Sequence, residues 1–355
     1  MPGARPRIRV SGGTSGLETR VHVVKTISME IGELFLDAES LRTGFEPDRR
    51  PLILIDLSAA DRTDKIELPA CPVIGVGDPH HPLAMFLDAV MAPPATLPVI
   101  AKSILEQPAA ARIAVQLLRL LPGLTAQDGL VMESLAYATL QGGASHRDWI
   151  AARRPAGPVA PGRVDVRHDA GRLTITLDRA DAGNAIDRPM RDALHEAFCV
   201  AAIDPEVRHV SLRAKGKAFS LGADLDEFGT TTDPAVAHLI RMRTLPAHMA
   251  ARCADKLDVH VDGACVGAGL ELAAWATRFT AAPNAWFQLP ELAMGILPGA
   301  GGCVSLTRRI GRQRTALMIL SGRRFNARQA LDWGLIDAIV DDPAGHDGQG
   351  NILAN

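Results

Sequence analysis

The stretch Val261-Asp-Gly-Ala-Cys-Val-Gly-Ala-Gly-Leu-Glu-Leu-Ala273 decides the fold of this 355-residue sequence. Small residues at 267–269 directly precede an apolar run, which predicts a buried helix over 269–276. Small residues let a ligand approach the backbone closely, and a helix N-terminus offers unpaired N–H groups to negative charge. Tight helix packing would also use small residues. Glu271 argues against that simpler interpretation, because a carboxylate among leucines and alanines is costly to bury without a function or a partner.

A second segment lies upstream, at Lys215-Gly-Lys-Ala-Phe-Ser-Leu-Gly-Ala-Asp-Leu-Asp-Glu-Phe228. It predicts the end of a strand and then a glycine-containing turn. Asp224 could cap the N-terminus of the element that follows the turn. Taken alone, the pattern favours an ordinary strand-to-helix turn. Such a turn can also leave the N–H of Ala223 unpaired and aimed outward, where it can hold a developing oxyanion.

A third segment lies downstream, at Phe287-Gln-Leu-Pro-Glu-Leu-Ala-Met-Gly-Ile-Leu-Pro-Gly-Ala-Gly-Gly302. Taken alone, Glu291 is better explained as a surface glutamate at a helix start after Pro290. Together, Glu271 and Glu291 are two carboxylates in apolar settings beside glycine-rich turns. Burial raises the pKa of a carboxyl group, which suits general acid/base catalysis near neutral pH.

The composition limits the class of protein. Apolar residues make up 47% of the chain, enough for a sizeable core, and 355 residues suit two modest domains. Aromatic residues make up only 4% and the net charge is −2, so we expect no nucleic-acid partner. The five cysteines form no CxxC pair, which suits a reducing cytoplasm. Neither a secretory signal nor a bilayer-spanning apolar run is visible, so we expect a cytoplasmic protein without a membrane partner.

Other ligand-binding motifs are incomplete. Gly75-Val-Gly77 follows a predicted strand, but His80 stands where a dinucleotide-binding fingerprint needs its third glycine. His80-His81 lies among prolines without a nearby acidic or cysteine partner, so a loop is favoured over a metal site. The sequence contains neither a GxSxG elbow nor a phosphate-binding P-loop. We therefore expect no metal ion and no redox cofactor.

Strands that alternate with helices predict an α/β fold. Before the three segments, strands are expected at 51–57 and 71–77. A helical block at 97–153 follows, broken at Pro108, Pro122-Gly123 and Gly142-Gly143. Thr125 can cap one of these helices. The residues of that helix predicted to face inward are Leu130, Val131, Leu135 and Ala138.

The clearest linker is Arg154-Pro-Ala-Gly-Pro-Val-Ala-Pro-Gly162, which can continue neither a helix nor a central strand. It divides the chain into an N-terminal region of residues 1–160, a core of residues 161–342 and a loose tail of residues 343–355. In the core, the predicted strands are 172–178, 207–213, 256–261, 278–281 and 335–340. The predicted helices are 188–203, 235–253 with an interruption at Pro246, 269–276, 304–320 and 326–333.

In combination, the three segments resemble the enoyl-CoA hydratase/isomerase (crotonase) family. The motifs follow in the order Ala-Phe-Ser-Leu-Gly-Ala-Asp-Leu (218–225), Gly-Ala-Gly-Leu-Glu-Leu (267–272) and Pro-Glu-Leu-Ala-Met-Gly-Ile-Leu-Pro-Gly-Ala-Gly-Gly (290–302). The likeness runs from about Arg163 to Asp342, roughly half the chain. It implies a crotonase-like spiral of ββα turns that assembles as a homo-oligomer, a trimer or a hexamer.

The resemblance also implies roles for individual residues. The oxyanion hole would use the N–H groups of Ala223 and Ala268, although glycine is commoner at the second position. Glu271 matches the carboxylate that handles water in hydratases, and Glu291 matches the one that delivers a proton to the α-carbon. The neighbouring residues expected to bind the substrate are Leu221, Gly222, Asp224, Leu225 and Gly267.

Because both glutamates are present, the resemblance favours a lyase of fatty acid metabolism that hydrates a 2-enoyl-CoA thioester reversibly. The substrate would be carried on coenzyme A, with no further cofactor. Another reaction of this family, by an isomerase, a hydrolase or a decarboxylase, is an alternative. A further alternative is a non-catalytic subunit that binds acyl-CoA or serves assembly, because a resemblance in fold alone does not establish a function.

The resemblance ends near Val340, where that family normally continues with helices that close the acyl pocket. The run Gly129-Leu-Val-Met-Glu-Ser-Leu-Ala-Tyr-Ala-Thr-Leu140 loosely resembles those terminal helices, although ordinary helical patterning would also explain it. We expect the helices of 97–153 to replace them and to pack on the core near Glu271. They would precede the core either by permutation or because residues 21–153 are the remnant of a first crotonase unit.

Overall fold

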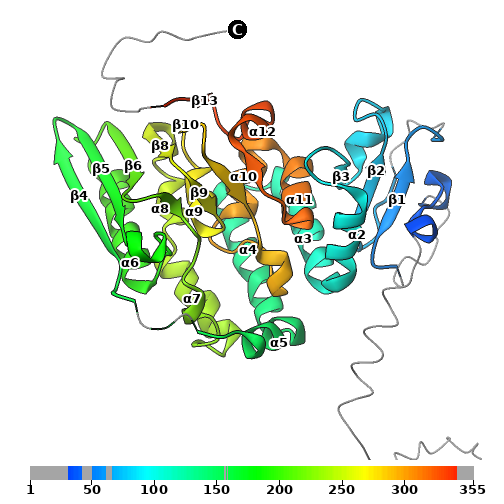
Figure 1. The fold of residues 1–355 in the computed structure, drawn as a ribbon, viewed down its shortest axis with the longest axis horizontal. Coiled ribbons are helices and arrows are strands. Elements are labelled where there is room, and N and C mark those ends of the chain that lie inside the picture. The colour runs from blue at the N-terminus through cyan, green and yellow to red at the C-terminus, as the bar shows by residue number, and fades with distance from the viewer. Residues whose placement is uncertain (1–30, 42–49, 61–65, 156, 158, 342–355) are drawn as a thin grey trace, which may run out of the picture.

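The computed structural model describes residues 31–41, 50–60, 66–155, 157 and 159–341. The expectation of a loose tail at 343–355 lies outside these residues. The described chain forms an α/β structure that runs from a small N-terminal sheet through a helical layer to a larger spiral of strands and helices (Figure 1).

The N-terminal sheet has three parallel strands in the order β1-β2-β3. They are β1 (Ile53–Asp56), β2 (Val73–Val76) and β3 (Ala89–Val90). The first two lie within the predicted strands at 51–57 and 71–77, and their short apolar runs are almost entirely buried, as parallel strands require.

Four helices follow: α2 (Leu97–Glu106), α3 (Pro108–Leu120), α4 (Ala126–Gln141) and α5 (Ala144–Ala152). Pro108 ends the first and begins the second, since proline lacks the N–H that an interior helical position needs but fits the first turn. Thr125 caps α4, its hydroxyl oxygen accepting the N–H of Asp128 at 3.1 Å. The predicted breaks and the predicted cap are therefore confirmed.

The predicted inward face of α4 was partly wrong. Leu130 is buried, but Leu135 is 44% exposed, while Glu133 is only 1% exposed. The reason is that α4 packs against α10 (Gly302–Ile310), and Glu133 accepts two N–H groups at the start of that helix. An apolar residue there would leave those donors without a partner.

The core consists of two sheets. The six-stranded sheet has the order β13-β10-β8-β6-β5-β4, and the four-stranded sheet has the order β12-β11-β9-β7. The strands of the larger sheet are β4 (Arg163–Asp169), β5 (Arg172–Asp178), β6 (His209–Ala214), β8 (Leu257–Val261), β10 (Arg278–Ala281) and β13 (Ala338–Ile339). Those of the smaller sheet are β7 (Ala218–Ser220), β9 (Ala264–Val266), β11 (Trp286–Gln288) and β12 (Phe325–Asn326).

Successive strands alternate between the two sheets. The pairs β6 and β7, β8 and β9, and β10 and β11 each place one strand in the larger sheet and the next in the smaller one. Helices follow these pairs, so the chain winds as a spiral of ββα turns, as predicted. The helices are α6 (Arg188–Ile203), α7 (Pro234–Thr244), α8 (Ala247–Ala250), α9 (Ala268–Ala273), α11 (Arg312–Ser321) and α12 (Ala327–Asp332), together with α10.

The single helix predicted at 304–320 is in fact two helices, α10 and α11. They meet at Gly311, whose φ of +81° lies in the region that favours glycine and that an α-helix cannot contain. Residues compatible with a helix stand on both sides of Gly311, which is why the sequence pattern concealed the break.

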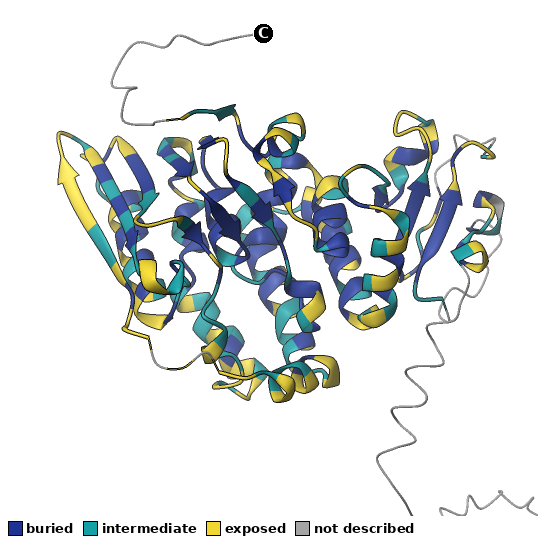
Figure 2. Cartoon of the chain, viewed as in Figure 1, coloured by how far each residue is buried: buried dark blue, intermediate teal, exposed yellow. Residues whose placement is uncertain are grey.

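The N-terminal helices pack directly on the spiral. α3 and α4 contact α10, α3 and β3 contact α11, and α4 also contacts α7. Burial extends from the spiral through α10 and α11 towards β1 and β2 (Figure 2). The prediction that the helices of 97–153 cover the core is confirmed, whereas the domain boundary at residue 160 stays a prediction.

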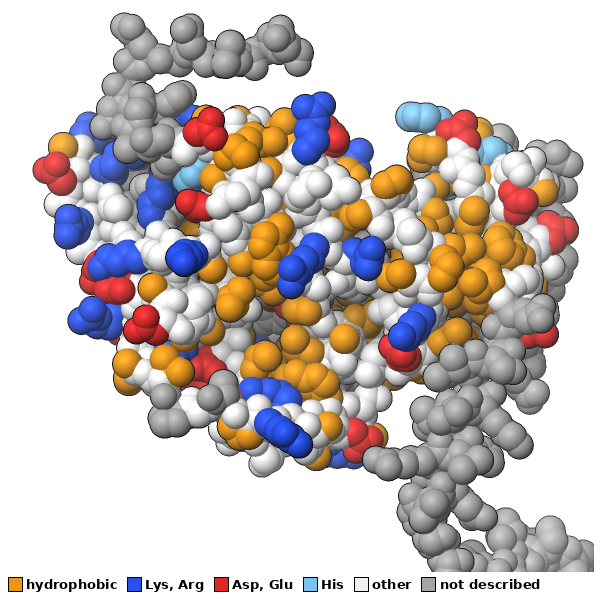
Figure 3. Space-filling view, viewed as in Figure 1, with side chains coloured by type: hydrophobic (Ala, Val, Ile, Leu, Met, Phe, Trp, Pro, Cys, Tyr) orange, Lys and Arg blue, Asp and Glu red, His pale blue; other side chains and the backbone are white. Residues whose placement is uncertain are grey.

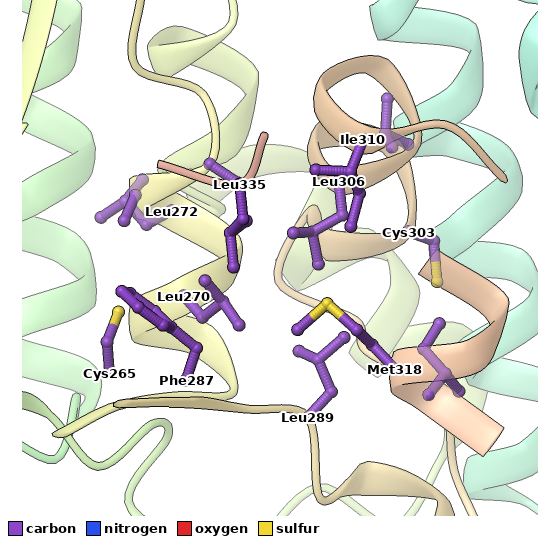
Figure 4. Packing of buried hydrophobic residues seen from close by; sticks show 14 of the residues in the cluster. Cys265, Leu270, Leu272, Phe287, Leu289, Cys303, Leu306, Ile310, Met318 and Leu335 are labelled. Atoms are coloured by element: carbon purple, nitrogen blue, oxygen red, sulfur yellow. The ribbon is translucent and has the colours of Figure 1, made fainter. Parts of the chain in front are cut away.

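One hydrophobic core joins the two halves. Leu270 of α9 and Leu306 of α10 point into it from opposite sides, and Met318 of α11 completes it (Figure 4). Within the described residues, no helix has both the length and the apolar character needed to cross a membrane.

Candidate active site

A cavity of about 360 Å³ lies between the spiral and the helices α4 and α7. Figure 3 shows the surface hollowed near the middle of this face, with apolar side chains around the opening. All nine site residues expected from the sequence line the cavity. They are Leu221, Gly222, Ala223, Asp224, Leu225, Gly267, Ala268, Glu271 and Glu291.

The backbone around Ala223 leaves its N–H available to the cavity. Ile186 bridges Ala223: its N–H donates to the carbonyl oxygen of Gly222 (2.8 Å), and its own carbonyl oxygen accepts the N–H of Asp224 (2.9 Å). In such a parallel bridge the N–H of the central residue points to the other side. The N–H of Ala223 donates to no residue that the structure describes.

Ala268 offers a second N–H. It is the first residue of α9, so its N–H has no intrahelical acceptor, and it donates to none of the described residues. A β-carbon on Gly222 would stand 3.6 Å from the nitrogen of Ala268, so the two backbone segments lie against each other. Together these two N–H groups could stabilise an oxyanion in the cavity.

Glu271 projects from α9 and is 2% exposed. Its Oε2 accepts the N–H of Ala300 at 2.6 Å and that of Gly302 at 2.8 Å. Residue 302 must be glycine, because a β-carbon there would lie 2.3 Å from the γ-carbon of Glu271. Burial raises the pKa of Glu271 to about 7, although the two N–H donors lower it. This carboxyl group is therefore suited to take up a proton near neutral pH.

Glu291 begins the short helix η10 (Glu291–Met294) and is 8% exposed. Its Oε2 is buried and has no hydrogen-bond partner among the described residues. Burial raises the pKa of Glu291 well above its ordinary value, and the neighbouring charge of Glu271 raises it further. The two glutamates thus line one cavity in different settings, one stabilised as an anion by N–H donors and one favoured as a neutral acid.

Asp224 contributes to the site mainly through its backbone. Its carboxylate caps the short helix η8 (Leu225–Glu227) through the N–H of Asp226 and pairs with Arg179 at 2.7 Å. This side chain is therefore already engaged in holding the Ala223 turn in place.

Helix α4, which lies outside the three sequence segments, contributes residues that the sequence analysis missed. Tyr137, the single tyrosine of the chain, lines the cavity with its ring against Gly299, where a β-carbon would lie 2.1 Å away. Glu133 is buried beside the Glu271 turn. The available signal for Glu133 was its place beside the predicted apolar face of the helix, where a carboxylate is unusual. Nothing local connected Tyr137 to Gly299, which is 162 residues away.

No group of three or more histidine, cysteine, aspartate or glutamate side chains in the described part of the chain is arranged to hold a metal ion.

The family model for enoyl-CoA hydratase/isomerase matches residues 167–346, which is half of the chain. The chain belongs to the enoyl-CoA hydratase/isomerase family. This match covers the spiral and all nine predicted site residues, and it leaves out the N-terminal sheet and helices α2 to α5. The predicted crotonase-like ββα core is confirmed.

Curated relatives support the same family. The chain is 34% identical over 178 residues to mevalonyl-coenzyme A hydratase of Beauveria bassiana, covering 48% of this chain and 64% of the relative. It is 33% identical over 167 residues to 2,3-dehydroadipyl-CoA hydratase of Escherichia coli, covering 47% of this chain and 65% of the relative. The chain thus spans slightly less than two thirds of the length of these relatives.

Two further proteins are similar to this chain. Trans-2-decenoyl-[acyl-carrier-protein] isomerase of Streptococcus mutans is 31% identical over 177 residues, covering 49% of this chain and 67% of the relative. Among solved structures, a putative enoyl-CoA hydratase/isomerase from Mycobacterium abscessus is 36% identical, covering 52% of this chain and 73% of that chain with a TM-score of 0.46.

Proposed function

We propose that this protein hydrates 2-enoyl-CoA thioesters reversibly, with Glu271 as the general base and Glu291 as the general acid. One observation carries the proposal: two buried carboxyl groups with different hydrogen-bond settings line the same cavity as two free N–H groups. Pairs of titratable groups in different settings are the usual basis of acid and base assignments.

Each proton has a source and a destination. Glu271 accepts a proton from water, and the resulting hydroxide adds to the β-carbon of the enoyl group. The electron pair of the double bond moves towards the thioester oxygen, where the N–H groups of Ala223 and Ala268 stabilise the enolate. Glu291 then gives its proton to the α-carbon, and the thioester carbonyl re-forms. Transfer of the proton from Glu271 to Glu291 through water resets the site.

Geometry and electrostatics support these roles. Each preorganised donor at an oxyanion is worth roughly a hundredfold or more in rate. Glu271 is held by two N–H donors, which favour its ionised form, whereas the unpartnered Oε2 of Glu291 favours its neutral form. The base is therefore ionised and the acid protonated in the same pH range.

The names of the relatives support a thioester substrate. Two of them are coenzyme A hydratases, and one is an isomerase of an acyl-carrier-protein thioester. We infer that a coenzyme A thioester also binds here, without a further cofactor. Assembly as a trimer or hexamer, a cytoplasmic location and a place in fatty acid metabolism stay predictions.

An assay of the purified protein with 2-enoyl-CoA thioesters of increasing chain length tests the proposal. Loss of the conjugated double bond with formation of 3-hydroxyacyl-CoA is the expected result. A shifted double bond would favour an isomerase, and free coenzyme A would favour a hydrolase. Binding without turnover of any thioester would reject an enzyme and favour an acyl-CoA-binding subunit.

A further inference from the structure

Glu133 of α4 lies on the far side of the turn that holds Glu271. Its side chain is 1% exposed, and its two oxygens accept the N–H groups of Gly301 (2.7 Å) and Val304 (3.3 Å). Glu271 accepts the N–H groups of Ala300 and Gly302 in the same turn. The first three N–H groups of the segment 300–304 therefore alternate between the two carboxylates.

We propose that Glu133 is a positioning residue for Glu271, and that it acts by holding the 300–304 segment that aims the Glu271 carboxylate. The proposal rests on the function proposed above. It gives the N-terminal region a part in the reaction, because α4 lies outside the residues that the family model matches.

Glu133 caps α10 from a distant helix, and it does so beside Glu271. Gly301 is the N-cap of α10 and has no side chain to satisfy the first N–H groups of that helix. Gly301 cannot carry a capping side chain of its own, because its φ is +104° and a β-carbon there would lie 2.5 Å from the β-carbon of Ala247. The structure instead buries a second carboxylate near Glu271, which costs free energy through desolvation and repulsion. The N–H donors and the helix dipole offset part of this cost.

Glu133 bonds to Gly301 and Val304 and does not line the cavity, so it can hold the turn without blocking the substrate. Gly302 cannot accept a side chain, because Glu271 fills that space, and Tyr137 fills the space beside Gly299. The turn is thus contacted from the spiral side by Glu271 and from the α4 side by Glu133 and Tyr137. Loosening the α4 side would let Ala300 and Gly302 move away from Glu271.

The charge of Glu133 also affects the pKa of Glu291, the proposed general acid. Repulsion from Glu133 is one of the causes that raise the pKa of Glu291, after burial and the charge of Glu271. Burial and the charge of Glu271 also raise the pKa of Glu133 well above its ordinary value, so its charge develops as the pH rises. Removing that charge should therefore move the alkaline limb of the rate profile, where Glu291 loses its proton, to lower pH. The other charged or titratable groups around Glu133 are Glu271 on α9, Cys303 on α10, Arg241 on α7 and Tyr137 on α4 itself.

The substitution Glu133→Gln tests the proposal in the full chain. It keeps the shape of the side chain, but an amide nitrogen cannot accept an N–H, so one of the two bonds is lost. We expect kcat to fall about a hundredfold, as for a catalytic group displaced by about 1 Å, with little change in KM. The alkaline limb should move to lower pH.

Ser134→Ala is the matched control. Ser134 is 2% exposed, also on α4, and bonds to Arg241 and His238 rather than to the turn. The control should reduce stability while leaving both limbs of the pH profile in place. If E133Q does not fold, E133D should keep the charge and the alkaline limb while lowering kcat, because the shorter side chain reaches the turn less well.

Hydrogen–deuterium exchange of the peptide that contains 300–304 supplies a readout that needs no turnover. Exchange should be faster in E133Q than in the natural protein and unchanged in S134A. The proposal would be overturned if E133Q had the same exchange rate and pH profile as the natural protein. It would also be overturned if S134A showed the faster exchange and the shifted alkaline limb expected of E133Q. If the unsubstituted protein turned over no thioester, the proposed function would be refuted instead. Hydrogen–deuterium exchange of 300–304 would still decide the role of Glu133.

Discussion

Glu291 occupies the space that a side chain at Gly267 would need. A β-carbon on Gly267 would stand 2.6 Å from Oε1 of Glu291. Gly267 also has a φ of +47°, and the next residue is Ala268, which offers its N–H to the cavity. The conformation of one glycine thus governs both the proposed acid and one proposed oxyanion donor.

Gly267→Ala should therefore damage both groups at once. We expect kcat to fall by about a hundredfold or more, because the acid and the N–H donor are both displaced. The free energy of unfolding should fall by about 1–3 kcal/mol from backbone strain. Steady-state kinetics and denaturant unfolding measure the two effects. Gly123→Ala is the control, since its β-carbon would meet no atom within 4 Å. Equal activity in the two variants would contradict the assignment.

The pKa of Glu271 determines the acid limb of the rate profile. Burial raises it to about 7, and the base must be ionised to accept a proton from water. The rate at low substrate, kcat/KM, should therefore fall as the pH drops through about 7, by about tenfold per pH unit. Glu271→Gln should remove nearly all turnover and leave coenzyme A binding almost intact. An acid limb near the ordinary glutamate pKa of 4.5 would contradict the raised pKa of Glu271.

Glu291 should make the fold less stable as the pH rises. Its pKa in the folded protein lies well above the ordinary 4.5, so its contribution to stability is full below 4.5 and is lost as the pH rises through the folded value. Glu291→Gln has no such proton to lose. The melting temperature of this variant should therefore fall less with rising pH than that of the natural protein. Parallel melting curves across the pH range would indicate that Glu291 has an ordinary pKa.

The N-terminal helices should be needed for a folded core. A shortened chain that begins at Pro161 lacks α3 and α4, so it exposes the buried faces of α10 and α11 and leaves the Gly301 and Val304 N–H groups without Glu133. We expect this chain to be insoluble or inactive, as size-exclusion chromatography and the hydration assay would show. A stable, active oligomer would establish the N-terminal region as an independent module.

The predicted site residues that the structure brings to one cavity share one property, which is that their signal is local. Glu271 and Glu291 stand out because each lies among apolar neighbours beside glycines, and all nine predicted residues line one cavity. Glu133 was missed because its partners Gly301 and Val304 are 168 and 171 residues away. No pattern within α4 indicates a contact with residues so far away in the sequence. The apolar Leu135 suggested a different inward face.

The break between α10 and α11 was missed for a different reason. Gly311 is the only glycine between two stretches of residues compatible with a helix, so a single helix at 304–320 fitted the sequence as well as two. Its positive φ is visible only in the three-dimensional structure.

The most direct test of the proposed chemistry is hydration in deuterium oxide. The protein is incubated with a 2-enoyl-CoA thioester in deuterium oxide, and the product is analysed by mass spectrometry and NMR. We predict a 3-hydroxyacyl-CoA that carries one deuterium at the α-carbon, delivered by Glu291, and we predict that Glu291→Gln abolishes its formation. An unchanged substrate, a shifted double bond or free coenzyme A in place of that product would contradict the account.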